Sequence, residues 1–368
     1  MKLFCDQKDL ANALNTVNKA ISPNNTLPVL NNILLKAEGK KLFLSATNLE
    51  LAISLFIDAD VRNEGSITIP ARLITNYVSL LKNEKIEMQL TEGLSLSIKS
   101  KESETKIKGI NADEFPLIPK IESPQTVKVA TEALSQAILR TVFAASQNTA
   151  KPVLSGVALF VDKDVLKVVA TDSYRLAEQK VNLETRSESP VQSIVPAKTI
   201  QELGKVLGKD GHKEVEIEFS PSQILFKVGD VEITSRLIEG KFPAYEKIFP
   251  KTNKTKIEVL EEDLMQTVKR VSLFARENNN NIKLSATNDG VLNLSTDETK
   301  VGEEKAQLPI TINGDNNKIA LNSQYLLDVL SYLDTDKVCV ELNDDLSPAV
   351  IKPCKEEGYV YIIMPLKV

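Results

Sequence analysis

The chain has 368 residues, of which 42% are hydrophobic and 26% charged, a composition typical of a globular protein with room for two or three domains. Its 45 basic and 50 acidic residues give a net charge of −5, which argues against gripping nucleic acid through bulk positive charge. A single histidine, and three cysteines without a CxxC pair, predict neither a metal site nor a cofactor. No apolar run approaches the ~18 residues that span a bilayer, so we expect a soluble, cytoplasmic protein in a reducing compartment, with no membrane partner.

The first third of the chain predicts a helix and then strands. Apolar residues at offsets of 0, 4, 7 and 11 define one face of that helix: Leu10, Leu14, Val17 and Ile21. Next, SITIPARLITNYVSLL at 66–81 predicts a short strand that enters an amphipathic helix. Strict alternation then indicates a strand with one buried face, formed by Ile86, Met88 and Leu90.

The same order of elements recurs twice. In the middle third the helical face comprises Leu134, Ile138 and Ala145, with Thr141 and Val142 sharing one position. A strand and helix follow at 193–207, and then the alternating residues Val215, Ile217 and Phe219. In the last third the face comprises Leu264, Val268, Val271 and Ala275, and the strand with its helix lies at 318–333.

Short sequence matches place these copies in register. LFLSATNLELA at 42–52 returns as LKVVATDSYRLA at 166–177 and more faintly as LNLSTDE at 292–298. Three sets of equivalent positions follow: Thr47, Thr171 and Thr296; Pro70, Pro196 and Asn322; and the prolines of Phe115-Pro116, Phe242-Pro243 and Met364-Pro365. Solenoid repeats are typically ~20 to 50 residues long, so a much longer period predicts three whole domains.

Each copy is predicted as an α+β unit with the order strand, helix, three strands, helix, three strands. Pro124, and Pro250 followed by KTNKT, have the composition of linkers. The predicted domains are therefore 1–122, 123–251 and 252–368.

Candidate catalytic motifs have simpler explanations. His212 lies in GKDGHKE, where a solvated loop is expected. GKVLGK at 204–209 is too short between its glycines for a phosphate loop, and Gly208 fits a helix C-cap. The acidic run 261–263 suits the start of a helix. We therefore predict that the protein is not an enzyme.

TDSYRL at 171–176 departs most from its own repeats. Asp172 and Ser173 suit a β-turn. The first copy has neither an aromatic nor an arginine there, whereas an exposed Tyr174-Arg175 pair beside apolar residues is typical of a recognition surface. The residues alone leave both interpretations open.

Five ordered segments resemble the bacterial DNA polymerase III beta subunit family, the sliding clamps. They are TLPVLNNILL at 26–35, ATDSYRLA at 170–177, EGKFPAY at 239–245, LNSQYLLDVL at 321–330 and YIIMPLKV at 361–368. The resemblance covers the whole chain. It implies three clamp domains, each with two helices packed on antiparallel sheets, in subunits that close head to tail as a homodimer ring around duplex DNA without sequence preference.

The resemblance also implies a pocket for short peptides of the replicative polymerase alpha subunit, the clamp loader and repair proteins. Its residues here are Leu154, Thr171, Ser173, Tyr174, Arg175, Leu176, Pro243, Ile248, Asn322, Tyr325, Ser347, Ile362, Met364, Pro365, Leu366 and Lys367. Arg175 and Ser173 would donate hydrogen bonds that fix the orientation of the peptide. Tyr174 replaces a histidine common in relatives.

A clamp that slides needs weak, sequence-blind attraction to phosphates. The expected DNA-facing residues are Asn24, Arg72, Lys82, Arg140, Asn148, Lys151, Lys198, Lys205, Lys209, Lys269 and Arg270. An ordinary solvated side chain is the alternative for each of them.

Ring closure should join a basic edge strand at 99–108 to an acidic edge at 297–304. The expected interface residues are Lys99, Lys101, Lys106, Ile107, Lys108, Leu273, Phe274, Asp297, Glu298, Glu303 and Glu304, with Leu273 and Phe274 packing against Ile107. Thr105 stands where relatives can carry an aromatic residue, which should weaken the joint. The alternative is two charged edges that only discourage aggregation.

Two other functions are alternatives to a sliding clamp. A sugar- or nucleotide-modifying enzyme would need convergent titratable groups, and the single histidine argues against it. A scaffold with the same fold that does not encircle DNA stays open, because the basic charge on the helices is modest.

Overall fold

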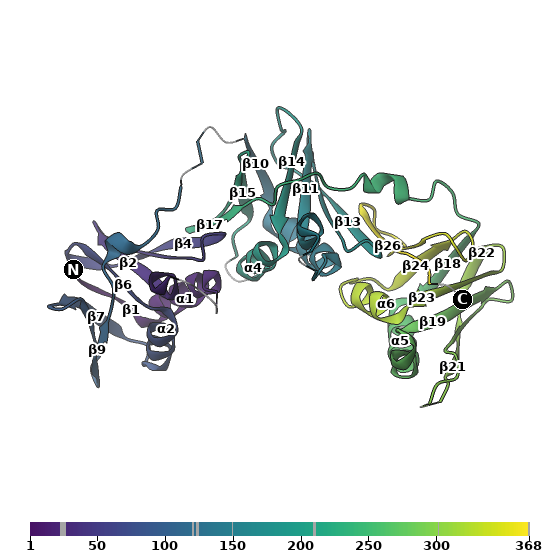
Figure 1. Ribbon diagram of the computed structural model, residues 1–368, viewed down its shortest axis with the longest axis horizontal. Helices are drawn as coiled ribbons and strands as arrows, with labels where there is room; N and C mark the ends of the chain where they lie inside the picture. The colour runs from purple at the N-terminus through teal and green to yellow at the C-terminus, as the bar shows by residue number, and fades with distance from the viewer. Residues whose placement is uncertain are drawn as a thin grey trace. The chain divides into compact units, whose positions relative to one another are not determined.

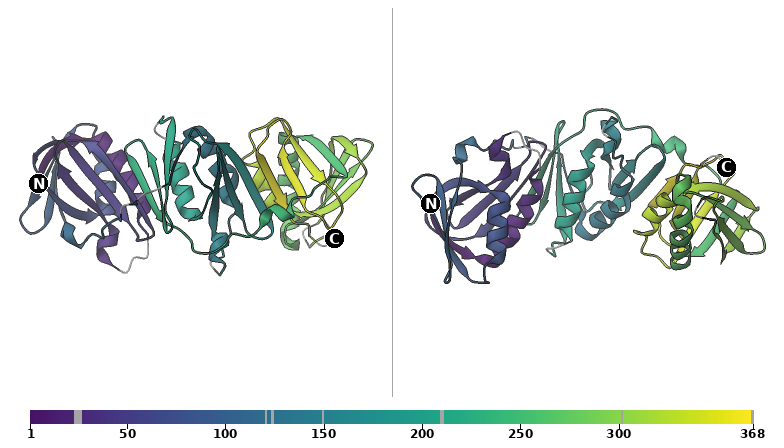
Figure 2. Two further views of the ribbon diagram at one scale, coloured as in Figure 1. Left: turned by 90° about the horizontal axis from the view of Figure 1, so that it is seen from above. Right: turned by 60° about the horizontal axis from the view of Figure 1, so that its bottom comes forward.

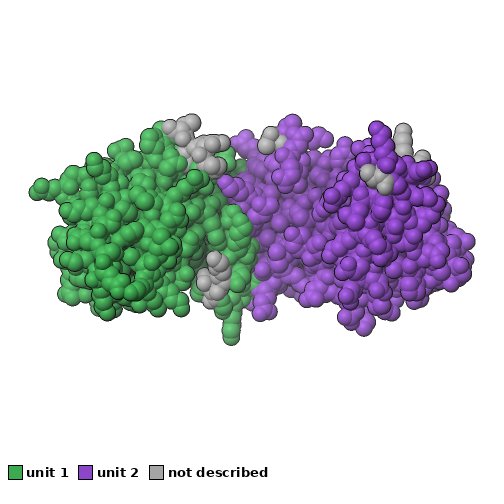
Figure 3. Space-filling view, turned by 90° about the horizontal axis from the view of Figure 1, so that it is seen from below, with its two compact units in different colours: residues 1–131, 202–237 green, residues 132–201, 238–368 purple. Residues whose placement is uncertain are grey.

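The computed structural model describes residues 1–22, 27–119, 121–122, 125–148, 150–208, 211–300 and 302–366. The chain forms two compact units (Figure 3). Unit 1 comprises residues 1–131 and 202–237, and unit 2 comprises residues 132–201 and 238–368. Within the described residues, no helix is both long and apolar enough to cross a membrane.

The three predicted copies are visible in the order of elements (Figure 1). The first contains β1 (Lys2–Asp6), α1 (Gln7–Val17), β2 (Asn32–Glu38), β3 (Lys41–Thr47), β4 (Leu51–Asp58), β5 (Asp60–Asn63), β6 (Gly65–Pro70), α2 (Ala71–Leu80), β7 (Lys85–Thr91), β8 (Ser95–Lys99) and β9 (Glu104–Lys108). The second contains β10 (Gln125–Ala130), α3 (Thr131–Thr141), β11 (Gly156–Asp162), β12 (Val165–Thr171), β13 (Arg175–Asn182), β14 (Val191–Pro196), α4 (Ala197–Leu207), β15 (Glu214–Phe219), β16 (Gln223–Val228) and β17 (Val231–Arg236).

The third contains β18 (Thr255–Leu260), α5 (Glu261–Ala275), β19 (Asn281–Thr287), β20 (Val291–Ser295), β21 (Lys305–Pro309), β22 (Thr311–Gly314), β23 (Asn317–Asn322), α6 (Ser323–Leu330), β24 (Lys337–Leu342), β25 (Ala349–Pro353) and β26 (Tyr359–Ile363). Four or five strands, rather than the predicted three, separate the two helices of a copy. Two of the extra strands, β5 and β22, contain no buried residue, so they lack the alternation that would have revealed them.

The predicted helical faces are confirmed as core. Leu10, Leu14 and Val17 on α1 are fully buried, and so are Val268 and Val271 on α5. The last member of the first two faces, Ile21 and Ala145, lies beyond the end of its helix. In unit 1, α1 packs against α2 and strands β3 and β4, and in unit 2, α5 packs against α6 (Figures 1 and 2).

All pairings between the strands of the described residues are antiparallel, and the larger sheet of each unit crosses from one copy into the next. Unit 1 has sheets ordered β5-β1-β7-β8-β9 and β10-β15-β16-β17-β4-β3-β2-β6. Unit 2 has sheets ordered β14-β11-β12-β13-β26-β25-β24-β18-β22 and β21-β20-β19-β23. We call the pairing of β17 with β4 the first joint and that of β13 with β26 the second joint; Ile233 faces Ile53 in the first and Leu176 faces Ile362 in the second.

The structure corrects the alignment of the third copy. Thr47 ends β3 and Thr171 ends β12, and each donates its hydroxyl to the carbonyl oxygen four residues on. In the third copy Thr287, at the end of β19, makes this hydrogen bond to Val291. Thr296 lies after β20 instead. The prediction matched LNLSTDE because its composition resembles the end of a strand, whereas SATNDG at 285–290 forms the equivalent turn.

Two of the three cysteines are joined in the structure. Cys339 on β24 forms a disulfide with Cys354, which lies just after β25, across a Cα–Cα distance of 5.0 Å. Their separation of 15 residues gave no signal in the sequence, because only the hairpin of β24 and β25 brings them together. Cys5 on β1 is a buried free thiol.

Candidate partner-binding sites

The turn between β12 and β13 forms one wall of the expected peptide pocket. The Asp172 carboxylate accepts hydrogen bonds from the backbone N–H groups of Tyr174 and Arg175, at 2.9 and 3.0 Å. Ser173 adopts a positive φ of 83°, and its N–H donates to the Thr171 hydroxyl. The predicted β-turn is therefore present, and it leaves the Tyr174 side chain 64% exposed.

Arg175 is not the exposed donor that the sequence suggested. Its side chain is only 11% exposed, and its guanidinium donates to the carboxylates of Asp172 and Asp328 and to the carbonyl of Phe143. The guanidinium also lies 4.4 Å from the centre of the Tyr325 ring. Arg175 therefore fixes the turn to α6 and cannot offer these same donors to a peptide.

Asp328 and Phe143 hold the Arg175 side chain in place, and neither was predicted from the sequence. Asp328 also accepts a hydrogen bond from Gln324. It is the only carboxylate in the LNSQYLLDVL segment, so an unpaired acid on an otherwise apolar helix was the available signal. Phe143 gave none, because its contact with Arg175 spans 32 residues.

The C-terminal segment lies beside this turn. β26 pairs with β13, and the N–H of Met364 then donates to the carbonyl of Tyr174 at 2.9 Å. The N–H of Leu366 donates to Ala320 at 2.8 Å. The side chains of Met364, Pro365 and Leu366 stay half-buried, which leaves apolar surface beside the turn. Lys367 lies outside the described residues.

A strap at 241–249 adds apolar residues to the same region. Phe242 and Tyr245 anchor it, in one buried cluster with Leu176, Val350 and Ile362. Anchoring these two rings leaves Pro243 and Ile248 exposed on the strap. The strap therefore presents apolar side chains at a site where the backbone is held in place.

The remaining expected pocket residues differ in their roles. Asn322 caps α6, because its side chain accepts from the N–H groups of Gln324 and Tyr325. Leu154 and Thr171 are buried, whereas Ser347 is half-buried. Its neighbour Leu346 is 77% exposed.

Arg175 and Tyr325 keep fixed protonation states near neutral pH. Burial by itself lowers the pKa of Arg175, but the Tyr361 hydroxyl and the Asp328 carboxylate raise it overall, so the guanidinium stays charged. Burial raises the pKa of Tyr325, and the nearby Asp172 adds to the effect. Both groups therefore hold one charge state at neutral pH.

Most expected DNA-facing residues are exposed on or beside helices. Those with exposed side chains are Arg72, Lys82, Asn148, Lys151, Lys198, Lys205, Lys269 and Arg270. Three of them form ion pairs: Lys82 with Glu102, Lys205 with Glu202 and Arg270 with Glu304. Asn24 and Lys209 lie outside the described residues.

Arg140 is the exception, and the prediction that it faces DNA is wrong. Its side chain is 1% exposed and donates to Glu356 at 2.5 Å, while its ring partner Tyr359 lies 5.5 Å away. The hydroxyl of Tyr359 donates to the Arg140 carbonyl. Arg140 thus links α3 to the turn between β25 and β26, a partnership over 216 residues that helical spacing cannot reveal.

The expected ring-closing edges differ from the prediction in secondary structure. Residues 99–108 are not one strand, since Lys99 ends β8 and Lys106 and Lys108 lie on β9. β9 is an edge of its sheet. Residues 297–304 belong to the connection between β20 and the edge strand β21.

The side chains of these edges are partly engaged within the subunit. Lys101, Lys106, Lys108 and Glu298 are exposed. Asp297 pairs with Lys283, and Glu303 pairs with Lys305. Ile107 is only 5% exposed because it faces its own sheet core, so it cannot be the main apolar partner of Phe274 and of Leu273, which is 57% exposed.

Two sequence features with catalytic or metal-binding potential have defined surroundings among the described residues. His212 is exposed in an irregular segment, as predicted. Glu258, Cys339 and Cys354 form the one cluster of potential metal ligands that the described residues contain. With both sulfurs in a disulfide, neither offers a thiolate to a metal.

The three family models of the DNA polymerase III beta subunit match successive parts of this chain. The N-terminal domain matches residues 1–119, the central domain 128–244 and the C-terminal domain 246–367. None of these is a catalytic family. The predicted boundaries near 122 and 251 stay a prediction.

Individual relatives match the chain over nearly its full length. The beta sliding clamp of Staphylococcus epidermidis is 32% identical over 365 residues, which cover 97% of this chain and 96% of the relative. That of Staphylococcus aureus is 32% identical over 363 residues, 96% of each. The sliding clamp of Bacillus subtilis has a TM-score of 0.95 at 29% identity, covering 100% of this chain and 99% of that one. A Pseudomonas aeruginosa clamp bound to griselimycin has a TM-score of 0.96 at 30% identity, with 100% of both chains covered.

Proposed function

This chain belongs to the DNA polymerase III beta subunit family, the sliding clamps of DNA replication, and from that premise we propose that two copies close head to tail into a ring around duplex DNA. The ring tethers the replicative polymerase, the clamp loader and repair proteins through the pocket at the second joint. The protein itself has no catalytic activity. The observation that carries the proposal is the family match across all three copies.

DNA contact in this proposal comes from exposed cations on the helices. Arg72 on α2, Lys198 on α4 and Lys269 on α5 belong to different copies, so they spread weak attraction along the bore. Lys82, Lys205 and Arg270 already have carboxylate partners, which lowers their contribution. Weak contacts without base recognition suit a protein that must slide.

Ring closure in this proposal pairs the edge strand β9 of one subunit with the edge strand β21 of the other subunit. Such pairing satisfies backbone groups that an edge leaves unpaired. The exposed lysines of β9 attract the acidic connection that precedes β21. Leu273 supplies exposed apolar surface near this connection, since its neighbour Arg270 pairs with Glu304.

Sedimentation at increasing salt tests the closure. Leu273→Ala with Phe274→Ala removes apolar anchors worth ~2 to 5 kcal/mol each if fully buried, so we expect a monomer at a salt concentration where the parent is still dimeric. A double mutant as dimeric as the parent would rule out this interface.

Retention on DNA of different topology tests encirclement. With clamp loader and ATP, the protein should stay on a nicked circular plasmid through gel filtration and leave once a restriction enzyme linearises the plasmid. Equal retention on both forms would mean ordinary DNA binding. It would favour the alternative of a scaffold that does not encircle DNA.

A further inference from the structure

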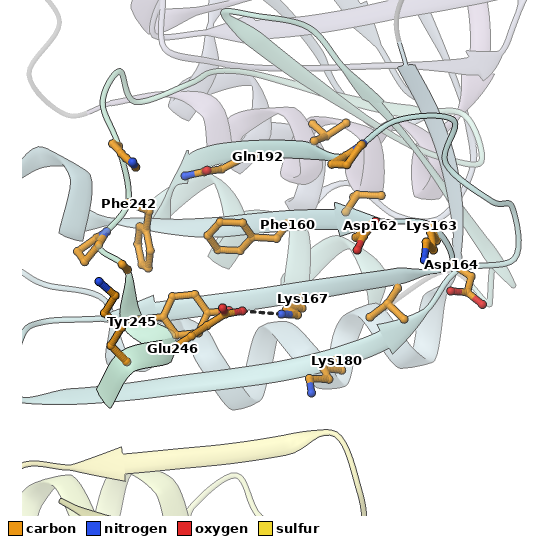
Figure 4. Close-up of a pocket in the computed structure, with 18 residues that line it drawn as sticks. Phe160, Asp162, Lys163, Asp164, Lys167, Lys180, Gln192, Phe242, Tyr245 and Glu246 are labelled. Carbon is orange, nitrogen blue, oxygen red and sulfur yellow. Dashed lines mark hydrogen bonds and ion pairs between the residues drawn. The ribbon is translucent and has the colours of Figure 1, made fainter. Parts of the chain in front are cut away.

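A cavity lies on unit 2, on one face of the sheet strands β11, β12 and β13 (Figure 4). Its volume is about 810 Å³, within the ~300–1,000 Å³ range of ligand pockets. The strap at 241–249 bounds it on one side and the turn between β11 and β12 on the other. It shares Pro243 with the expected peptide pocket, but Arg175, Tyr174 and the 364–366 segment do not line it.

The floor of this groove is apolar and rigid. Phe160 and Val165 are half-buried lining residues of the groove, and Phe160 lies against the buried rings of Phe242 and Tyr245. Phe160 lies 6.1 Å from Phe242 and 5.8 Å from Tyr245, between ring centres. The Tyr245 hydroxyl donates to the buried Glu178 carboxylate at 2.6 Å, and burial raises the Tyr245 pKa far above neutral pH. The floor therefore keeps its shape without a ligand.

The rim of the groove is basic on a chain whose net charge is −5. Five lysines line the groove, against the three carboxylates of Asp162, Asp164 and Glu246. Lys167 pairs with Glu246 at 2.8 Å, and this pair appears as the dashed line in Figure 4. Lys163, Lys241 and Lys247 are exposed, and no ion pair between described residues uses them. Three cations thus surround an open apolar floor.

We propose that this groove binds an acidic peptide segment carrying an aromatic or aliphatic side chain. The apolar side chain would cover Phe160 and Val165, and flanking carboxylates would pair with Lys163, Lys241 and Lys247. Nucleic acid is the less suitable anion. Its evenly spaced phosphates would meet Asp162 and Asp164 at one end, whereas a peptide places its carboxylates individually and turns N–H donors toward those acids.

Fluorescence anisotropy with a labelled EEFDELEE peptide tests the proposal on the full chain. We expect saturable binding that weakens as salt increases. The matched peptide EESDESEE keeps the charge but lacks the apolar side chains, so it should bind at least about tenfold more weakly. Equal binding of the two peptides would show that the apolar floor does not contribute to binding, and it would overturn the proposal.

Two sets of variants locate the binding. Lys163→Glu with Lys241→Glu and Lys247→Glu should weaken EEFDELEE binding by about tenfold or more. The control Lys8→Glu with Lys40→Glu and Lys85→Glu alters the net charge equally at exposed lysines of unit 1 and should leave affinity within about twofold. Equal losses in both triple variants would show a nonspecific charge effect and contradict the proposal.

Val165→Lys separates the floor from the rim. This variant adds a positive charge but removes apolar surface, so we expect weaker binding of EEFDELEE, with circular dichroism confirming the fold. Tighter binding would mean that charge alone governs the site. An oligothymidylate of equal charge that binds more tightly than EEFDELEE, and loses that binding in the Lys163, Lys241 and Lys247 triple variant, would assign the groove to nucleic acid instead.

Discussion

The two joints contain the same backbone turn but differ in the side chains around it. At the first joint, Asn48 accepts from the N–H groups of Glu50 and Leu51, and Leu49 takes a positive φ of 75°. At the second joint, Asp172 accepts the corresponding hydrogen bonds, and Ser173 takes a φ of 83°. The local geometry is therefore inherited by both copies, and it does not by itself make a binding site.

The side chains packed around each turn make the difference. Leu51 at the first joint is buried where Arg175 stands at the second, and the cavity beside it is only about 90 Å³. Next to the helices, the first joint is open and the second is filled. A polar cavity of about 740 Å³ lined by Thr16 and Asp230 lies open at the first joint, whereas Arg140 with Glu356 occupies the second. The second joint is thus locked on one side and offers apolar surface on the other.

The largest effect should come from removing the C-terminal wall of the second joint. Deletion of residues 364–368 should weaken a labelled clamp-binding peptide of the replicative polymerase at least about 100-fold, because the half-buried apolar side chains beside the turn are lost. Leu117→Ser, at an exposed site of the first joint, is the control and should change nothing. Loss of the dimer in the deletion variant would show that the segment has another role.

Removing the lock should have the next largest effect. Arg140→Ala should lower the free energy of unfolding by about 3 to 4 kcal/mol, because it leaves a cavity where a buried side chain packed beside Tyr359. Arg140→Met should keep most of the stability, and Thr16→Ala at the first joint should cost under about 0.5 kcal/mol. Denaturant unfolding measures all three. Unchanged stability together with weakened DNA binding in Arg140→Ala would support the prediction from the sequence that Arg140 faces DNA.

The third largest effect should come from the disulfide, which lies in unit 2. Cys339→Ser with Cys354→Ser should cost about 3 kcal/mol, the value expected for a closed loop of about 15 residues. Reductant should produce the same shift in the parent and none in the double variant, as judged by thermal unfolding. If reductant lowered the stability of both proteins equally, the disulfide would not be the cause.

The smallest effect on stability should come from Cys5 in unit 1, and it depends on pH. Burial, followed by Asp6 and Asp9, raises the pKa of this thiol to about 12. The unfolded chain therefore loses this proton at lower pH than the folded chain, so stability falls as pH rises above about 9. Between pH 8 and 10 the parent should lose about 1 kcal/mol more than Cys5→Ala. Equal losses would indicate a thiol that ionises normally.

The sequence predicted elements whose signal lies within one segment. Helical faces such as Leu264, Val268 and Val271 were right because burial repeats with the helical period. Errors arose where the deciding partner is distant. Arg140 meets Glu356, and Arg175 meets Asp328, only after β13 and β26 pair. A guanidinium on a helix or turn has the same pattern whether it faces solvent or a carboxylate from another copy.

The site itself was predictable in composition but not in role. The resemblance gave the residues around the turn, yet it could not tell that Arg175 has its donors occupied. Ile107 was expected to reach a partner, but its place on β9 turns it into its own core. In a strand, alternate side chains point to opposite faces of the sheet. Because the chain breaks between β8 and β9, the face on which Ile107 lies could not be predicted by treating 99–108 as one strand.

Sheets that pass from one copy to the next determine how the chain comes apart. The middle copy contributes β10 and β15–β17 to the eight-stranded sheet of unit 1, and β11–β14 to the nine-stranded sheet of unit 2. Cooperative unfolding follows hydrogen-bonded sheets, so amide hydrogen exchange should show two blocks with a border inside the middle copy. A fragment cut at the ends of a copy would lose part of a ladder at each cut. We therefore expect the three repeats of the sequence to unfold in two steps.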